Sequence, residues 1–316
     1  MKKKNILILG ISGQDGSYLS HYLLRKNFRI IGISRKKKNI KNHEKLGIKG
    51  KIIIKNFDYN NYEKLKKIIT TYQVNEIYFL AGQTKPNISN EKVLETLYSN
   101  IVPVYNIIDI IINYNKKIKF FNSSSCEIFK ASKKSLDENS IKDPNTIYAL
   151  SKLISFKMVK FFREKFSLKI CSGILFHHES ILREKDFVIR KIISSANQIN
   201  KNKIGSLKLG DIDVSRDWGW APEYVKLMHR ILNKKKFDDY IIATGKSTKL
   251  REVVKKTFKY YNLNWKMHVK YEKNLLRKFD IKVRKANTLK IKKDLKWQPK
   301  NYIDDVVFNL INEKVF

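Results

Sequence analysis

The feature that most constrains the fold is a glycine-rich turn that follows the first apolar run of the chain. Residues 5–9 form a run rich in Ile and Leu that ends at a glycine, as buried parallel strands do. The turn Gly-Ile-Ser-Gly-Gln-Asp-Gly at 10–16 follows at once, and residues 17–24 have the pattern of an amphipathic helix. A strand, turn and helix in this order bring the backbone and the helix N–H groups close to a pyrophosphate. We therefore predict a dinucleotide site here; the alternative is an ordinary tight turn.

The second expected strand, at 28–33, indicates which dinucleotide is bound. In NAD-binding proteins of this class, an acidic residue near the end of this strand holds the ribose hydroxyls. This chain instead has Ser34 and then a basic run at 35–38 that begins with Arg35. Because a cation there suits a 2′-phosphate, we expect NADP rather than NAD. The alternative is a solvated basic loop in a basic protein.

Strand and helix patterns alternate along the first 175 residues. Further strands are expected at 51–54, 76–81, 117–122 and 168–175, and helices at 62–71, 93–114 and 147–166. This alternation predicts an α/β fold with a doubly wound parallel sheet, a Rossmann fold. Ligands of such sheets bind at the carboxyl ends of the strands, so one cleft is expected to collect Gly10, Ala81, Ser125 and His177. We expect an NADP-binding domain at 1–175 and a mainly substrate-binding domain at 176–316, interleaved with the first.

The helix at 93–114 is apolar almost all round, whereas a surface helix shows one apolar stripe. We therefore expect it to pack on the sheet with one face and on another subunit with the other. Pro103 lies inside it and is expected to kink it or to shift its start.

A tyrosine and a lysine one helical turn apart indicate alcohol–ketone chemistry. Tyr148 and Lys152 share a helix face, and an ammonium favours the phenolate, so the tyrosine suits a general base. The serines at 123–125 close the preceding strand, where a hydroxyl would hydrogen-bond the sugar oxygen being oxidised. The alternative is an ordinary exposed helix pair.

Glu127 distinguishes the candidate reactions. Once carbon 4 of a hexose is a ketone, a carboxylate can remove the acidic proton of carbon 5 while the group on carbon 6 leaves as water. Hydride then returns to carbon 6. A plain dehydrogenase has no use for this carboxylate; the alternative is a surface or capping glutamate. Cys126 is expected to be a small buried filler.

The composition is strongly basic. The chain has 316 residues, 42% of them hydrophobic, and a net charge of +37, which would attract phosphate-rich ligands or nucleic acid. The lysines are spread along the chain, and Lys, Asn and Ile share A/T-rich codons. We therefore expect no specific nucleic-acid partner; the charge suits an anionic nucleotide substrate.

The cysteines, the apolar start of the chain and the histidines indicate the cellular compartment and argue against a metal site. Cys126 and Cys171 do not make a disulfide framework, so we expect a cytoplasmic protein. The apolar start is too short for a signal peptide, and no stretch resembles a membrane span. The histidines lack metal-ligand spacing, so no catalytic metal is expected.

Four further motifs carry a family resemblance. They are Gly-Ile-Ser-Gly-Gln-Asp-Gly-Ser-Tyr-Leu at 10–19, Gly-Ile-Leu-Phe-His-His-Glu-Ser at 173–180, Arg-Asp-Trp-Gly at 216–219 and Ala-Thr-Gly at 243–245. Together they resemble the extended short-chain dehydrogenases/reductases (NAD-dependent epimerases/dehydratases) and, within them, the GDP-mannose 4,6-dehydratases, over nearly the full chain. The resemblance implies an NADP-containing hydro-lyase that converts GDP-mannose to GDP-4-dehydro-6-deoxy-mannose, as a homodimer or homotetramer. That product belongs to deoxysugar biosynthesis, with GDP-fucose among its destinations.

The resemblance also implies a role for each matching residue. The catalytic set would be Ser125, Glu127, Tyr148 and Lys152. The NADP contacts would be Gly10, Ile11, Ser12, Gly13, Gln14, Asp15, Gly16, Arg35, Asp58, Leu80, Ala81, Gly82, Gln83, Thr84, Lys152, His178 and Arg183. The substrate contacts would be His177, Glu179, Ser180, Arg216, Arg277 and Asp280.

The chain departs from the family pattern at several of these positions. It has Ser125 in place of Thr, His177 in place of Asn, Ile181-Leu182 in place of Pro-Arg, Glu95 in place of a cofactor-contacting Tyr, Gly82 and Lys85 in place of Ala and His, Asp280 in place of Glu, and Asn287 in place of Asp. Two alternatives therefore stay open: another nucleotide-sugar dehydratase, epimerase or reductase of the same family, and a non-catalytic basic binding protein.

Overall fold

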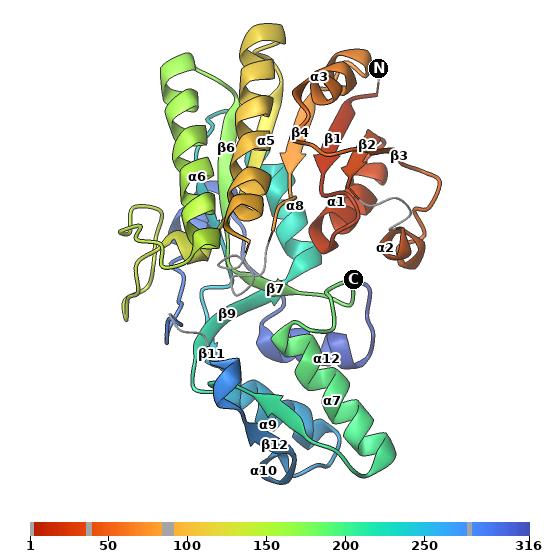
Figure 1. Ribbon diagram of the computed structural model, residues 1–316, viewed down its shortest axis with the longest axis vertical. Helices are drawn as coiled ribbons and strands as arrows, with labels where there is room; N and C mark the ends of the chain where they lie inside the picture. Colours follow the sequence, from red (N-terminus) through yellow and green to blue (C-terminus); the bar gives the residue numbers. More distant parts are fainter. Residues whose placement is uncertain (1–2, 36–39, 84–91, 277–279) are drawn as a thin grey trace. The chain divides into compact units, whose positions relative to one another are not determined.

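The computed structural model describes residues 3–35, 40–83, 92–276 and 280–316 and divides into two compact units (Figure 1). Unit 1 comprises Met1–Lys130, Ser140–Leu175 and Ala221–Ile242, and unit 2 comprises Ala131–Asn139, Phe176–Trp220 and Ala243–Phe316. We describe each unit by itself. The expectations for Lys36, Lys37, Lys38, Thr84, Lys85 and Arg277 lie outside the described residues.

Unit 1 is built on a seven-stranded sheet, counted over the described part of the chain, in which every neighbouring pair is parallel. In spatial order the strands are β10 (Tyr240–Ile242), β6 (Ile170–Leu175), β5 (Lys119–Ser125), β4 (Glu76–Phe79), β1 (Asn5–Leu9), β2 (Arg29–Ser34) and β3 (Ile53–Asn56). The strand order reverses between β1 and β4, which is where doubly wound sheets bind their ligands. The predicted fold class is confirmed.

Helices cover both faces of this sheet. They are α1 (Gln14–Leu24), α2 (Lys41–Lys45), α3 (Tyr62–Thr71), α5 (Val93–Tyr114), η1 (Cys126–Ile128), α6 (Ile147–Phe166) and α8 (Ala221–Leu232). Because strand side chains alternate between faces, Leu7, Ile31 and Phe120 share one buried cluster with residues of α3, α5 and α6. On the other face α1 packs on α8, and α8 packs on β5 and β6. Burial on both faces explains why the strands are nearly continuous apolar runs.

Two boundaries near the site differ from the sequence expectation, whereas the bounds of α5 agree with it. α1 begins at Gln14, so the end of the glycine turn is already helical. β5 continues to Ser125, because its pairing with β6 extends to Ser125 opposite Leu175. α5 begins at Val93 and runs through Pro103, so the expectation that the proline shifts the start of the helix is wrong. A proline inside a helix lacks its own N–H donor and crowds the preceding turn, but the residues of α5 on both sides of it are buried, polar before it and mostly apolar after it.

Unit 2 has a three-stranded and a two-stranded sheet among its described residues. Strand β9 (Ser215–Trp220) lies between β7 (His177–Glu179), which is parallel to it, and β11 (Ser247–Lys249), which is antiparallel. Strands β8 (Leu207–Leu209) and β12 (Val269–Tyr271) form the small parallel sheet. The helices are α7 (Val188–Asn202), α9 (Leu250–Tyr260), α10 (Trp265–His268), η2 (Lys273–Leu275), α11 (Leu289–Leu295) and α12 (Ile303–Ile311).

Within the residues that the structure describes, no helix combines the length and the apolar character that crossing a bilayer requires.

Candidate active site

The glycine turn between β1 and α1 packs so closely against neighbouring backbone that only residues without side chains fit at two of its positions. Gly10 has φ +86°, and a Cβ on it would lie 2.7 Å from the Leu80 carbonyl oxygen. A Cβ on Gly16 would overlap the Gly10 carbonyl oxygen. The first N–H groups of a helix have no partner inside the helix, and the N-cap residue of α1, Gly13, has no side chain to cap them. The turn and the helix N-terminus therefore form a cradle that suits a pyrophosphate, and the predicted dinucleotide site stays a prediction.

The end of β2 is fixed against this turn. The Ser34 and Ser12 hydroxyl groups lie 3.1 Å apart. Arg35 follows, with its guanidinium 5.4 Å from the centre of the buried Tyr59 ring and 4.0 Å from the Glu95 carboxylate. Asp58 is exposed at the end of β3, where its carboxylate accepts a hydrogen bond from the Asn60 N–H at 3.0 Å. The predicted cofactor contacts thus gather at the carboxyl ends of β1, β2 and β3.

The segment after β4 is held by polar residues of α5. The Gln83 N–H donates to the Ser99 hydroxyl at 3.3 Å, and the Asn100 amide donates to the Gln83 carbonyl at 3.3 Å. Both α5 residues are buried. The sequence analysis did not single them out; the available signal was a group of polar residues at the start of a helix whose later part is mostly apolar. Ser99 and Asn100 thus hold the segment that comprises Leu80, Ala81, Gly82 and Gln83. This segment lies beside the glycine turn, because the Leu80 N–H donates to the Leu9 carbonyl at 2.9 Å.

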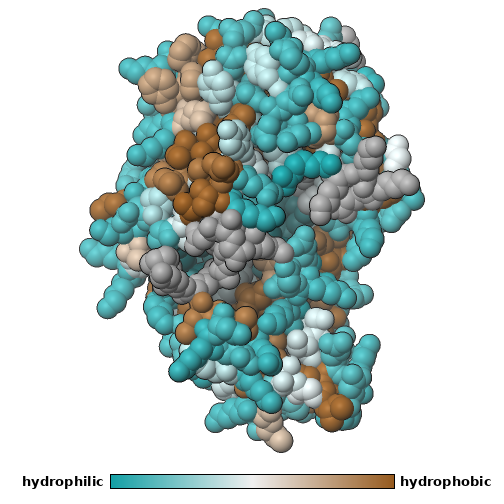
Figure 2. All heavy atoms as spheres, viewed as in Figure 1, coloured by the Kyte–Doolittle hydropathy of each residue, from teal (hydrophilic) through white to brown (hydrophobic). Residues whose placement is uncertain are grey.

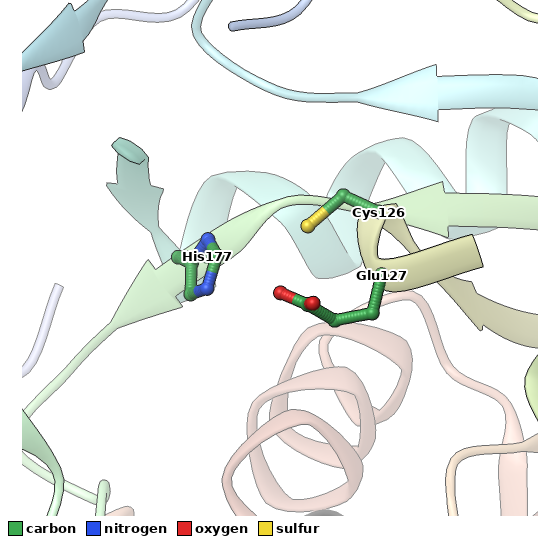
Figure 3. A group of neighbouring side chains, drawn as sticks. All are labelled: Cys126, Glu127 and His177. Carbon is green, nitrogen blue, oxygen red and sulfur yellow. The ribbon is translucent and has the colours of Figure 1, made fainter. Parts of the chain in front are cut away.

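The predicted catalytic residues lie at the end of β5 and the start of α6. Ser125 ends β5 and is the N-cap residue of η1. Its hydroxyl accepts a hydrogen bond from the Glu127 N–H at 3.2 Å. Figure 3 shows the Cys126 and Glu127 side chains leaving η1 on the same side. Tyr148 is in the first turn of α6, where the Thr146 hydroxyl caps the Ala149 N–H at 3.1 Å. Ser125 and Tyr148 are each 8% exposed, which suits side chains that line a site.

Lys152 is the buried cation of this site. Its side chain is 3% exposed, and its ammonium donates to the Ser123 carbonyl at 3.0 Å. Burial lowers the pKa of Lys152 to about 8, because desolvation penalises the charged form. The bond to Ser123 ties α6 to β5, so Lys152 and the serine-rich end of β5 have a fixed relative position.

In unit 2, the predicted nucleotide and substrate contacts cluster on β7 and β9. Arg216 is 5% exposed and its guanidinium donates to the Asp280 carboxylate at 2.6 Å, so the structure pairs two residues predicted to hold the substrate. His177, His178 and Glu179 form β7, and the Nδ1 of His178 donates to the Phe176 carbonyl at 2.7 Å. The Ser180 hydroxyl accepts from the Leu182 N–H, and Arg183 lies 3.6 Å from the centre of the Phe187 ring.

Asp217 links two motifs that are far apart in the sequence. Its buried carboxylate accepts hydrogen bonds from the Thr244 N–H at 2.9 Å, the Thr244 hydroxyl at 2.7 Å and the Gly245 N–H at 2.7 Å. Burial raises the pKa of Asp217 to about 6, against these hydrogen bonds, which lower it. The motif at 216–219 and the motif at 243–245 are therefore one structural feature.

Cys126 and Cys171 are both buried, and neither forms a disulfide. Burial raises the pKa of the Cys171 thiol far above its usual range. The burial of Cys126 agrees with a filler role for this residue. The absence of a catalytic metal stays a prediction.

The fold and the glycine cradle define a Rossmann-fold protein of the short-chain dehydrogenase/reductase type. Solved structures of similar fold include dTDP-glucose 4,6-dehydratase from Bacillus anthracis in complex with NAD, with a TM-score of 0.86 and 18% identity over 98% of this chain and 96% of that one. UDP-glucose 4-epimerase from Thermotoga maritima matches with a TM-score of 0.84 and 18% identity over 98% of both chains.

Sequence comparison identifies the family. The family described as GDP-mannose 4,6 dehydratase matches residues 7–310. GDP-mannose 4,6 dehydratase 1 of Arabidopsis thaliana is 31% identical over 98% of this chain and 90% of its own length, and the human GDP-mannose 4,6 dehydratase is 29% identical over 99% and 92%. The chain belongs to the GDP-mannose 4,6-dehydratase family, as the motifs predicted.

Proposed function

We propose that the protein is a hydro-lyase that converts GDP-mannose to GDP-4-dehydro-6-deoxy-mannose. The observation that carries the proposal is the placement of Glu127 two residues after Ser125, at the end of the strand to which buried Lys152 is tied. The names of the relatives at about 30% identity support the substrate.

We further propose NADP as the cofactor. The cradle formed by Gly10 and Gly16 fits its pyrophosphate, and Arg35 at the end of β2 suits its 2′-phosphate. His178 and Arg183 would hold its other end. When bound, the cofactor supplies hydride acceptance from carbon 4 of the sugar and hydride return to carbon 6.

The chain's own residues would move the protons. Tyr148 takes the proton of the carbon 4 hydroxyl, while the Lys152 ammonium favours the phenolate and Ser125 hydrogen-bonds the sugar oxygen. Glu127 then removes the proton of carbon 5, which the new carbon 4 carbonyl has made acidic. The electron pair of that C–H bond forms the carbon 5–carbon 6 double bond. The Glu127 carboxyl gives its proton to the departing carbon 6 hydroxyl, which leaves as water. When hydride is returned to carbon 6, Tyr148 gives the proton that it took from the carbon 4 hydroxyl to carbon 5.

Arg216 and Asp280 would bind the guanosine diphosphate. Arg216 suits a diphosphate oxygen by its chemistry, because guanidinium groups bind such oxygens through paired N–H donors. Asp280 at 2.6 Å holds that guanidinium in place. Arg277, which lies outside the described residues, is proposed for the same ligand.

We propose a homodimer or homotetramer that uses the outer faces of α5 and α6. Exposed apolar residues recur at helical spacing on both helices, at Leu94, Tyr98 and Tyr105 on α5 and at Leu150, Ile154 and Phe161 on α6. Figure 2 shows an apolar patch over this region of unit 1. A patch of this kind is typical of an interaction surface. The molar mass of the protein in solution tests the proposal.

Incubation of the purified protein with GDP-mannose, followed by mass spectrometry, tests the activity. We expect loss of one water with no net consumption of NADPH. Glu127→Gln should lower turnover by about a thousandfold, because the amide cannot take the carbon 5 proton. Glu164→Gln, an exposed glutamate of α6, is the matched control and should leave turnover unchanged.

The other outcomes separate the alternatives. Unchanged turnover in Glu127→Gln would remove the assigned role of the carboxylate. An isomer of unchanged mass would point to an epimerase, and dependence on added NADPH to a reductase. No turnover together with salt-sensitive binding of RNA or DNA would point to a basic binding protein.

A further inference from the structure

A carboxylate from α5 lies near the end of β2, and the proposed cofactor site does not use it. Arg35 is the described cation at the position where doubly wound folds contact the adenine ribose or its 2′-phosphate. Its guanidinium is not isolated, because the Glu95 carboxylate lies 4.0 Å away. Glu95 comes from the first turn of α5, and its other carboxylate oxygen lies 3.3 Å from the Lys92 ammonium.

Other observations agree with this placement. Arg35 lies over the ring of Tyr59 at 5.4 Å. Burial raises the pKa of Tyr59, with the charges of Asp58 and Glu95 adding to the shift and Arg35 opposing it. The two carboxylates and Arg35 therefore act on one small region at the ends of β2 and β3.

We propose that Glu95 is a specificity-determining residue that weakens the preference of this chain for NADP over NAD. The inference rests on the proposed function, because it concerns the cofactor of that site. A 2′-phosphate would have to share Arg35 with the Glu95 carboxylate and would lie close to a like charge, which is unfavourable. A ribose with a free 2′-hydroxyl meets no such repulsion, and a carboxylate beside a ribose is the arrangement that selects NAD.

Glu95 has no large structural role that would obscure the test. Its side chain is 49% exposed and that of Arg35 is 43% exposed, and ion pairs as solvated as this contribute little to folding. Replacing Glu95 by glutamine keeps the shape of the side chain and removes the charge.

The test is calorimetric measurement of the dissociation constants of NADP⁺ and NAD⁺ for the wild type and two variants. For Glu95→Gln we expect the NADP⁺ dissociation constant to fall by about fivefold, while that for NAD⁺ changes by less than about twofold. The gain should shrink at high ionic strength, because salt screens charges at the surface. The matched control is Glu252→Gln, which removes a first-turn glutamate of α9 that is paired with a lysine three residues away; it should leave both constants unchanged.

The outcomes distinguish this inference from the proposed function. If both dinucleotides bind and Glu95→Gln leaves the ratio of their constants unchanged, the role of Glu95 is wrong and the cofactor site stands. An equal gain in Glu252→Gln would assign the effect to overall charge and would also overturn the inference. If neither dinucleotide binds the wild type, the cofactor assignment itself fails.

Discussion

The buried charged residues at the two ends of the unit 1 sheet differ in their hydrogen-bond partners. At the amino ends of the strands, Glu76 is 1% exposed, and it accepts hydrogen bonds from the Tyr78 hydroxyl at 3.0 Å and the Asn233 amide at 3.4 Å. His229 lies 3.6 Å from the same carboxylate. At the carboxyl ends, Lys152 has a backbone carbonyl of Ser123 as its partner at 3.0 Å.

The pKa values follow this difference. Burial alone would raise the pKa of Glu76, but the adjacent His229 and the hydrogen bonds from Tyr78 and Asn233 hold it below its ordinary value. Burial lowers the pKa of Lys152 to about 8. A charge surrounded by side-chain partners stabilises the fold, whereas a charge held by one carbonyl keeps donors for a ligand. The amino ends are therefore structural and the carboxyl ends are available for chemistry.

Of the variants considered, Lys152→Met is expected to have the largest effect, a loss of activity. Turnover of GDP-mannose should fall by about a thousandfold, because Tyr148 loses the cation that favours its phenolate. The free energy of unfolding should rise by about 1–3 kcal/mol at neutral pH, since a desolvated charge is replaced by an apolar chain. Steady-state kinetics and urea unfolding measure the two quantities. In the wild type, turnover should decline above about pH 8, where Lys152 loses its proton.

Lys160→Met, at an exposed lysine of α6, is the control for that variant and should change neither quantity. If Lys152→Met loses stability but keeps full turnover, Lys152 has a structural role, and the distinction between the two ends of the sheet is wrong.

The next effect is on stability, from Glu76→Gln. The free energy of unfolding should fall by about 3 kcal/mol, because the amide cannot satisfy the donors around it, while turnover per folded molecule stays unchanged. The folded pKa of Glu76 lies below the ordinary value of 4.5, so its stabilisation is present above pH 4.5 and is lost as the pH falls through the folded value. Urea unfolding over a pH series should show this loss in the wild type and a flatter dependence in the variant.

Glu44→Gln removes an exposed carboxylate that pairs with Lys49 and should cost less than about 0.5 kcal/mol. If Glu76→Gln and Glu44→Gln lower the free energy of unfolding equally, the buried contacts of Glu76 contribute no more to stability than an exposed ion pair does.

The smallest expected effect is from Ser99→Ala. The Gln83 N–H loses its acceptor, so the segment after β4 should loosen and cofactor affinity should fall by about three- to fivefold, equivalent to about 1 kcal/mol. Calorimetric titration measures this. The control, Ser155→Ala, removes a buried hydroxyl that donates to a carbonyl of its own helix, and should leave cofactor affinity unchanged. An unaltered affinity in Ser99→Ala would show that the segment holds its shape without α5.

The fold was predictable because its signals are local. Apolar runs, a glycine turn and helical periodicity each lie within a short window, and both faces of the sheet are buried. The family was predictable because four separate motifs agree. The roles assigned to the site residues stay predictions.

Contacts between distant segments were not predictable. The bonds from Thr244 and Gly245 to Asp217 join residues separated by 27 and 28 positions, and neither motif alone signals the other. The proximity of Arg35 and Glu95 likewise depends on how α5 packs beside the ends of β2 and β3. Periodicity predicts which face of a helix is buried, but it does not predict which polar residue at its end meets a strand end.

The route of the chain through unit 1 has a consequence for protein synthesis. The segment Ala221–Ile242 supplies α8, which packs on β5 and β6, and β10, which pairs with β6 and forms one edge of the sheet. A nascent chain that has emerged only through β6 therefore holds β5 and β6 with one apolar face uncovered and leaves the outer edge of β6 unpaired. Such edges and faces favour aggregation. We expect the first half of this chain to depend on chaperones until α8 has left the ribosome, and a gene truncated after β6 to yield inclusion bodies.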